Sequence, residues 1–341
     1  MTVKMKNISV IAGLAVLFLV LWGAGSLAGP PKGFSGFGKT TDVSPDDHEL
    51  VFSYYHDDDA ALYTVPVSGG EAERLAKPDE GKSYVHPTFS PDGEKLVFME
   101  QWEEETEGEK RRYSQLRIMA RHDDSVKTLM NTSDYITEAA FSPDGESLYY
   151  LKADTYQNYS PVASEQPHDC DVFRLDLASG ETEQITEKES YDMSSLNVSP
   201  DGDRLMYTTF NNGDQLHVRD LKTGQEETLV PAADFASNQT VISAPAFSSD
   251  GDHAVFSSVA AKDKQGTYIY EGFRMNLETE EAEQLTNFHE HVTSPVSFHQ
   301  ADKWLVTVDN NFARADSDYN YWKISADGDE REPVTINMPD T

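Results

Sequence analysis

A short turn motif that recurs at intervals of 46 to 57 residues constrains this chain more than any other feature. Three copies read Ser-Pro-Asp-Gly and begin at Ser90, Ser142 and Ser199. Proline presets φ for the second position of a type I turn, aspartate suits the third, and glycine accepts the left-handed conformation at the exit. Such a turn closes a short hairpin. The chain is therefore expected to repeat one β unit.

Six units can be aligned on this motif. A short apolar run follows each turn, rich in β-branched and aromatic residues, as expected of a strand. The equivalent turn positions are Pro45, Pro91, Pro143, Pro200, Ser249 and Gln300. The sixth copy, aligned as Phe298-His299-Gln300-Ala301-Asp302 ahead of KWLVTV, departs furthest from the pattern.

Each unit also carries a second hairpin, as in Val172–Thr186 (VFRLDLASGETEQIT) and Phe273–Thr286 (FRMNLETEEAEQLT). Two hairpins per unit predict a four-stranded antiparallel blade, and six such units predict an all-β, six-bladed β-propeller. A sandwich of stacked hairpins is the alternative, but turns at this regular period favour the propeller. The inner strand of the first unit is expected within residues 38–43, and no strand is left over to close the ring.

The paired motifs resemble the TolB-like propeller repeats, a WD-like family named for its Pro-Asp signature. The resemblance covers about Thr41 to Thr335. It implies a six-bladed scaffold that is reused for protein docking, carbohydrate recognition and, occasionally, catalysis in the channel. It does not imply a single function.

An apolar run of 20 residues, Ile8–Leu27, precedes the repeats. As a helix it would span roughly 30 Å, the thickness of the hydrocarbon core of a bilayer. Lys4 and Lys6 flank it on the N-terminal side, which favours a cytoplasmic N-terminus and places the rest of the chain outside.

Two interpretations of this segment remain open: an uncleaved single-pass anchor in the cell membrane, or a signal peptide cleaved near Ala28 to give a secreted protein. The predicted organisation is therefore an anchor or signal peptide over residues 1–28, a Gly/Pro linker over residues 29–40 and the propeller over residues 41–341.

The composition excludes several classes of protein. With 27 Lys and Arg against 60 Asp and Glu, the net charge is −33, which disfavours nucleic-acid binding. The single cysteine, Cys170, excludes a disulfide scaffold and a Cys-rich zinc site, and it is expected to be inert. The motifs of serine hydrolases, zinc proteases, phosphate loops and dinucleotide-binding folds are absent.

The zigzag of strands within a blade predicts which segments share a face of the propeller. Both short turns of each unit should lie on one face, and the loops between the second and third strands should lie on the other. All long insertions belong to this second face, and insertions on one side of a repeat protein are commonly its binding side. The predicted insertion loops are Glu100–Arg112, Lys152–Asp171, Val259–Thr267 and Asp309–Asp318.

A polar ring is expected at the mouth of the central channel on that same face. Hydroxyl groups, one histidine and two carboxylates could hold a peptide end, a sugar or a cation there, although a water-filled hole is the simpler expectation. The predicted ring comprises Tyr84, His86, Thr137, Glu138, Asp192, Ser194, Ser195, Ser243, Thr293 and Ser294.

A metal site is a weaker hypothesis. His289 and His291 could join His86 around a divalent cation, but their spacing is not helical and a third ligand is not assured. The acidic runs at residues 57–59 and 100–107 lack the spaced ligands and the glycine of a calcium loop, so they are expected to be solvated. No cofactor is predicted.

These features predict a membrane-tethered, extracytoplasmic, monomeric propeller that binds a protein or cell-envelope partner through its insertion-bearing face and has no catalytic activity. The alternative is a lyase or hydrolase that acts on cell-wall or acidic polysaccharide in the channel, with His86, His289 or His291 as the base. A third hypothesis is a structural or sensory module that serves a partner kinase or transporter.

Overall fold

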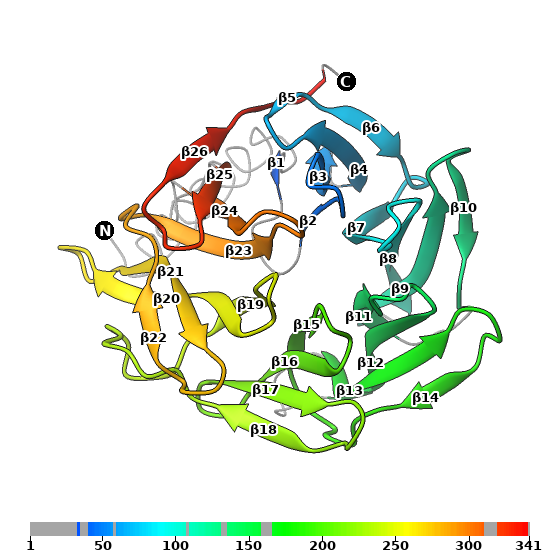
Figure 1. Cartoon of the computed structure of the whole chain (residues 1–341). Helices are drawn as coiled ribbons and strands as arrows, with labels where there is room; N and C mark the ends of the chain where they lie inside the picture. The colour runs from blue at the N-terminus through cyan, green and yellow to red at the C-terminus, as the bar shows by residue number, and fades with distance from the viewer. Residues whose placement is uncertain are drawn as a thin grey trace, which may run out of the picture.

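The computed structural model describes residues 33–34, 40–56, 59–106, 109–130, 135–157, 166–309 and 319–339. These residues form strands, turns and irregular segments and contain no α-helix. The strands are arranged radially around a central channel, so the chain is an all-β propeller (Figure 1). The predicted anchor over residues 1–28 lies outside the described residues. Within the part of the chain that is described, no helix is long and apolar enough to cross a membrane.

The first sheet has five strands. Its order is β1-β3-β4-β6, and β2 also pairs with β3. The strands of this region are β1 (Gly33–Phe34), β2 (Thr41–Val43), β3 (Glu49–His56), β4 (Asp59–Pro66), β5 (Gly70–Glu71) and β6 (Glu73–Ala76). The inner strand β2 lies within the predicted residues 38–43. β1 shows that part of the predicted linker pairs with the first sheet.

Three four-stranded antiparallel sheets follow in chain order. The first contains β7 (Lys82–Phe89), β8 (Lys95–Thr106), β9 (Glu109–Ala120) and β10 (Ser125–Thr128). The second contains β11 (Tyr135–Phe141), β12 (Ser147–Gln157), β13 (Gln166–Asp176) and β14 (Thr182–Gln184). The third contains β15 (Met193–Val198), β16 (Arg204–Phe210), β17 (Asp214–Asp220) and β18 (Glu226–Leu229).

The remaining large sheet has eight strands, because a single parallel bridge between Tyr270 and His291 joins two four-stranded arrays. The first array contains β19 (Ser243–Phe247), β20 (His253–Lys262), β21 (Tyr268–Asn276) and β22 (Ala282–Gln284). The second contains β23 (His291–Ser297), β24 (Lys303–Asp309), β25 (Tyr319–Ser325) and β26 (Arg331–Val334). The last strand is β27 (Ile336–Asn337).

The hydrophobic core lies between neighbouring sheets. Neighbouring residues of a second strand point to opposite faces of their sheet, so Val51 packs toward the β7 sheet and Phe52 toward the β23 array. Both faces are buried, which explains why these strands read as nearly continuous apolar runs such as LVF and LMY. The pairs that mark the clusters are Phe52–Leu305, Val51–Phe98, Met99–Tyr150, Leu151–Tyr207, Met206–Phe256 and Val255–Trp304.

The ring is closed by a strand that the sequence did not indicate. β27 pairs in parallel with β5 in a two-stranded sheet of their own, so the end of the described chain lies beside the first unit (Figure 1). Gly70 donates its N–H to the carbonyl oxygen of Thr335 at 2.8 Å, and Ala72 donates to Asn337 at 2.8 Å. The expectation that no strand was left for closure is therefore wrong.

The predicted register of the sixth turn is also wrong, by one residue. In the other units the turn serine donates its N–H across the turn, as Ser90 does to Lys95 at 2.9 Å. In the sixth turn Phe298 makes this bond, to Lys303 at 3.1 Å. Phe298 therefore takes the place of the serine, and His299 rather than Gln300 is equivalent to Pro91.

Candidate functional site

The recurring turn is held by its own side chains. In the second unit, Ser90 Oγ accepts the N–H of Lys95 at 2.9 Å, and Asp92 Oδ1 accepts the N–H of Glu94 at 3.0 Å. Ser90 Oγ also donates to Asp92, and this hydrogen bond is the main reason that the pKa of Asp92 lies below its usual value. The serine and the aspartate of the motif are therefore structural, because both are used within the turn.

The two turns of a unit lie on the same face, as predicted. The residue that opens the second turn donates its N–H to a carbonyl oxygen in the first turn. Examples are Arg121 to Glu94 at 2.9 Å and Leu177 to Glu146 at 3.0 Å. We call this side the turn face, and the opposite side, at the β8–β9 and β12–β13 connections, the ribbon face.

Neighbouring units interlock on the turn face through proline and glycine. A Cβ atom built on Gly145 would lie 3.6 Å from Cδ of Pro91, and one built on Gly202 would lie 3.2 Å from Cδ of Pro143. The motif glycine therefore provides space for the proline of the preceding unit, in addition to its positive φ.

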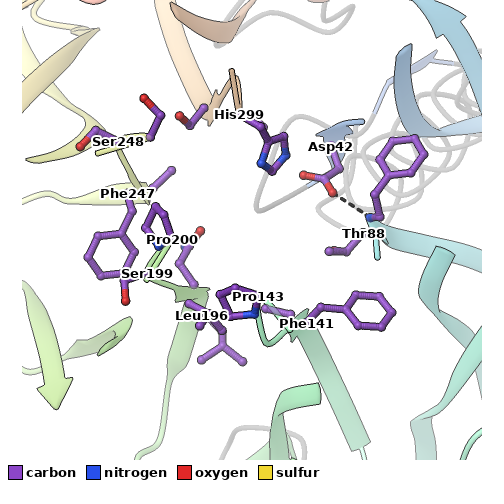
Figure 2. A pocket seen from close by; sticks show the side chains of 18 of the residues that line it. Asp42, Thr88, Phe141, Pro143, Leu196, Ser199, Pro200, Phe247, Ser248 and His299 are labelled. Atoms are coloured by element: carbon purple, nitrogen blue, oxygen red, sulfur yellow. Dashed lines mark hydrogen bonds between the residues drawn. The ribbon is translucent and has the colours of Figure 1, made fainter. Parts of the chain in front are cut away.

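These turns surround a cavity of about 300 Å³ where the channel opens on the turn face (Figure 2). Its wall is mostly apolar, with Phe89, Phe141 and Phe247 beside the turn prolines. Figure 2 shows Asp42 and His299 on one side of this cavity, with Pro143 and Leu196 on another. The sequence did not indicate an apolar cavity on this face.

Polar side chains of the innermost strands join neighbouring sheets. Asp42 of β2 accepts the N–H of Phe89 in β7 at 2.9 Å (Figure 2). Glu138 of β11 accepts the N–H groups of Ser195 at 3.0 Å and Leu196 at 2.7 Å. Glu138, a predicted ligand-binding residue, is thus occupied in holding β11 to β15.

Two members of the polar ring that was predicted on the ribbon face lie instead at the cavity on the turn face. Ser195 and Ser294 line the turn-face cavity. Tyr84 does not lie at the mouth: it is 6% exposed and packs on Phe98 with ring centroids 4.6 Å apart. The prediction for Tyr84 failed because its side chain packs into the hydrophobic cluster between the first two sheets.

The other members of the ring lie in the innermost strands or next to them. Ser194 Oγ lies 2.9 Å from Thr208 Oγ1, and Thr293 Oγ1 lies 3.4 Å from Ser294 Oγ in a buried position. His86, Thr137 and Ser243 are half-buried, and Asp192 is exposed.

Bulges in the innermost strands explain why the predicted ring residues do not point to one common site. The pairing register shifts in β7, β11, β15, β19 and β23. At four of these bulges a non-glycine residue has a positive φ: 53° at His86, 61° at Ser195, 48° at Ala244 and 48° at Ser294. A bulge re-aims side chains along a strand, so counting residues back from the turn could not place them.

Two aspartates on the ribbon face, Asp192 just before β15 and Asp214 at the start of β17, have raised pKa values. Loss of solvation raises the pKa of Asp192, even though the residue retains exposed surface. Loss of solvation also raises the pKa of Asp214, and repulsion from Asp192 adds to the effect, while the N–H of Ile242 opposes it. Nearby, burial lowers the pKa of His291 to about 4, against the opposing effect of Asp309.

The predicted histidine trio is not brought together as a metal site. Among the described residues, no group of three or more His, Cys, Asp or Glu side chains is arranged to hold a metal ion. His289 is exposed and donates its backbone N–H to Glu271 Oε1 at 2.7 Å. His291 is buried against the ring of Tyr270, with centroids 4.5 Å apart.

In the described residues, the first three long insertions begin as paired extensions of the blade strands, which we call ribbons. β8 and β9 pair continuously as far as Thr106 opposite Glu109, and β12 and β13 as far as Gln157 opposite Gln166. The third insertion continues β20 and β21 to Lys262 opposite Tyr268. Residues 310–318 of the fourth insertion lie outside the described residues.

The described part of the acidic run, residues 100–106, belongs to strand β8 and is not a loop. Glu100 is 1% exposed and forms ion pairs with Lys82 at 3.3 Å and Arg117 at 3.0 Å. Farther out, three acidic residues of β8 lie directly opposite three basic residues of β9, which favours pairing of the ribbon. The opposed pairs are Glu103–Arg112, Glu104–Arg111 and Glu105–Lys110.

Aromatic side chains join the first two ribbons. Trp102 stacks on Tyr113 across the β8–β9 ribbon, with centroids 5.7 Å apart. The Arg111 guanidinium lies 5.5 Å from the centroid of the Tyr156 ring on the β12–β13 ribbon, and Tyr156 donates its hydroxyl to the carbonyl oxygen of Arg112. We call Trp102, Arg111, Tyr113 and Tyr156, all partly exposed, the aromatic ridge.

The inert character predicted for Cys170 is consistent with its surroundings. The thiol is buried, and its pKa is raised to about 12 by burial first and by nearby carboxylates, including Asp192 and Asp171, second. A thiolate would therefore be scarce at neutral pH.

No protein-family model and no curated protein matches this sequence. Solved structures with a similar fold include TolB from Acinetobacter baumannii, with a TM-score of 0.57 and 14% identity over 89% of this chain and 65% of that chain. This chain therefore spans less than two thirds of that TolB. A putative TolB from Agrobacterium tumefaciens has a TM-score of 0.58 and 16% identity over 78% of this chain and 89% of that chain.

An oligogalacturonate lyase in complex with manganese is similar to the same degree, with a TM-score of 0.57 and 14% identity over 89% of this chain and 84% of that chain. At such identities the similarity establishes the fold only. The neighbours confirm that the expected TolB-like propeller fold is present, and they include both TolB proteins and a lyase.

Proposed function

We propose that this chain is a membrane-tethered, extracytoplasmic, six-bladed β-propeller that binds a protein partner through its ribbon face and has no catalytic activity. The count of six treats the eight-stranded sheet as two blades joined by the single bridge between Tyr270 and His291. The hydrophobic clusters support this count, because each lies between two neighbouring units and together the six clusters complete a ring.

The position of exposed apolar side chains is the observation on which the binding role depends. Among the described residues, the large apolar side chains that remain exposed are Tyr191 at 44%, Phe210 at 53%, Val230 at 58% and Tyr268 at 39%. Tyr191 precedes a first strand, Phe210 ends a second, Tyr268 begins a third and Val230 follows a fourth. All four positions lie on the ribbon face, as the antiparallel order of the strands requires.

The aromatic ridge adds the residue types that contribute most to binding energy at protein interfaces. Trp, Tyr and Arg are enriched among such residues because they bury a large area and also offer a polar group. The ridge is built on paired strands and tied across two ribbons, so little conformational entropy would be lost when it is buried.

The proposal can be tested by recovery of partners from detergent-solubilised native membranes. The tagged full chain is compared with Trp102→Ala and Tyr268→Ser, and with Glu94→Ala on the turn face as the control. A protein that is recovered with the wild type and the control but lost from both ribbon-face variants would support the proposal. Equal recovery with all four chains would contradict it, provided that circular dichroism shows each variant to be folded.

The enzymatic alternative requires its own assay. The chain is incubated with polyuronides, with and without divalent cations, and the release of unsaturated products is followed by absorbance. Turnover that disappears in His86→Ala would support a lyase and overturn the non-catalytic assignment.

A further inference from the structure

The chain approaches the propeller from the ribbon face. β1 runs antiparallel to β3, with Gly33 opposite Tyr55 and Phe34 opposite Tyr54, close to the ribbon-face end of β3. β2 then continues toward the turn face, with Thr41 opposite Phe52 and Val43 opposite Leu50. The innermost strands of the other sheets also run from the ribbon face to the turn face. The topology therefore supports an approach from the ribbon face independently of β1.

The link to the predicted membrane segment is short. The apolar run ends at Leu27, and only residues 28–32 separate it from Gly33. A fully extended chain spans at most about 3.6 Å per residue, so Gly33 can be no more than about 20 Å from the end of the run. From Tyr55, which lies opposite Gly33, to Glu49 at the turn-face end of β3 is six residues, or about 20 Å at 3.3 Å per residue. The link could therefore reach the turn face only if it were fully extended along the side of the propeller, whereas it meets the ribbon face without such extension.

From this geometry we infer that the anchored protein turns its ribbon face toward the outer surface of the bilayer, and that the partner bound there is the extracytoplasmic part of a membrane-embedded protein. The inference rests on the proposed function and specifies the class of partner. A partner confined to this narrow layer would gain a high effective concentration at the ribbon face.

The charge of the ribbon face favours a protein over the lipid surface as the occupant. The chain carries a net charge of −33, and the connector at residues 187–192 reads Glu-Lys-Glu-Ser-Tyr-Asp. Anionic headgroups would be repelled. The basic residues Arg111 and Arg112 of the β8–β9 ribbon do not compensate, because they lie opposite Glu104 and Glu103. The surface therefore fits a protein segment with apolar side chains at its centre and basic side chains around them.

The orientation can be measured without knowing the partner. Glu94 directly precedes β8 on the turn face, Glu105 lies near the ribbon-face end of β8, and both are exposed. Full-length Cys170→Ala protein carrying either Glu94→Cys or Glu105→Cys is labelled with a donor fluorophore and reconstituted in vesicles that contain an acceptor-labelled lipid. We expect severalfold higher energy transfer from position 105. Equal transfer, or higher transfer from position 94, would overturn the inferred orientation.

A spacer variant controls for the length of the link. Twenty Gly and Ser residues inserted after Lys32 should reduce the difference between the two positions, because a long flexible link no longer fixes the orientation. If the difference were unchanged, the short link would not be its cause and the argument from chain length would fail.

The class of partner is tested by photo-crosslinking in intact cells from the same two positions. Crosslinks from position 105, but not from position 94, to a protein with a membrane-spanning segment would support the inference. Crosslinks only to lipid, or only to a protein without such a segment, would overturn it. If the energy transfer difference is found but position 105 forms no crosslink, the orientation stands and the proposed binding function fails.

Discussion

At the residue scale, the carboxylate of Asp47 in the first unit stabilises the turn of the sixth unit, where the turn motif is degenerate. In the sixth turn Phe298 occupies the position of the motif serine and Gln300 that of the motif aspartate. Asp47 supplies the missing acceptors from the first unit: Oδ1 accepts the N–H of His299 at 2.7 Å, and Oδ2 accepts those of Gln300 and Ala301, both at 2.8 Å. The side chain at the glycine position of the first turn thus closes the ring on the turn face.

Replacement of Asp47 by glycine should lower the free energy of unfolding by about 1–3 kcal/mol, because three backbone donors lose a charged acceptor. Glycine is chosen because φ is 59° at this position, so the backbone is not strained by the change. Urea unfolding provides the measurement. The control is Asp302→Gly, an exposed residue of the same sixth turn. An equal loss of stability in both variants would show that Asp47 has no special role.

His291 should make the stability depend on pH. Burial lowers its pKa to about 4, although Asp309 opposes the effect, whereas an unfolded histidine has a pKa of 6.5. Between these values the unfolded chain binds more protons than the folded chain, so stability falls as the pH decreases from about 6.5 to about 4.

Urea unfolding of the wild type and His291→Asn at pH 7 and pH 4.5 tests this expectation. The loss of stability between the two pH values should be smaller in the variant, by about 2 kcal/mol. Carboxylates that titrate in the same range are common to both proteins and cancel in the comparison. An identical loss of stability in both proteins would show that the pKa of His291 is not lowered by folding.

At the element scale, the ribbons are extensions of core strands, so their inner and outer parts have different roles. The inner part of the β8–β9 ribbon contains Glu100, whose carboxylate pairs with Lys82 and Arg117. The outer part begins beyond Trp102 and Tyr113, which lie directly opposite each other. This boundary follows from pairing and burial, and the run of glutamates in the sequence does not reveal it.

A short trim and a long trim of this ribbon should therefore behave differently. Joining Trp102 to Tyr113 through Asn-Gly in place of residues 103–112 should leave the domain folded, since this dipeptide forms the tight turn of a two-residue hairpin. Joining Met99 to Leu116 in the same way removes Glu100 and leaves Arg117 without its buried partner, which should cost about 3–5 kcal/mol.

Thermal unfolding followed by circular dichroism compares the two trimmed chains. The short trim should unfold close to the wild-type temperature, and it should also lose the partner if the ribbon tip and Arg111 contribute to binding. A short trim as unstable as the long one would show that the ribbon tip is part of the folding unit.

At the scale of the whole molecule, the propeller depends on closure between its first unit and its last strand. β27 adds to β5 through backbone hydrogen bonds, and Ile336 and Met338 pack against the cluster shared by the first sheet and the β23 array. The close approach of the chain at Gly69 is part of this closure: a Cβ atom built there would lie 2.4 Å from the carbonyl oxygen of Thr335.

Gly69→Ala should therefore displace the closing strand and lower the free energy of unfolding. The control is Gly81→Ala, because Gly81 has a similar positive φ, 78° against 84°, but faces open space. The strained backbone should lower the free energy of unfolding by about 1 kcal/mol in both variants. The clash with Thr335 should lower it by about 1–3 kcal/mol more in Gly69→Ala. Equal stabilities would show that closure through Thr335 contributes little.

The sequence alone determined the repeat, the strand content and the assignment of both short turns to one face. These features are encoded locally, by the φ preferences of Pro and Gly and by side chains that bond within the same turn, such as Ser90 and Asp92. They can be read in any unit without knowledge of its neighbours. The interlocking of Gly145 with Pro91 strengthens the ring but was not needed to predict the turn.

Only the tertiary structure decided what depends on contacts between units. The burial of Tyr84, the engagement of Glu138 by β15, the capping of the sixth turn by Asp47 and the pairing of β27 with β5 all join residues that are distant in sequence. The bulges of the innermost strands could not be predicted from the sequence either, because residues as different as His86 and Ala244 adopt a positive φ there. Local preferences fix the unit, whereas packing between units determines which polar side chains remain available at the channel and on the ribbon face.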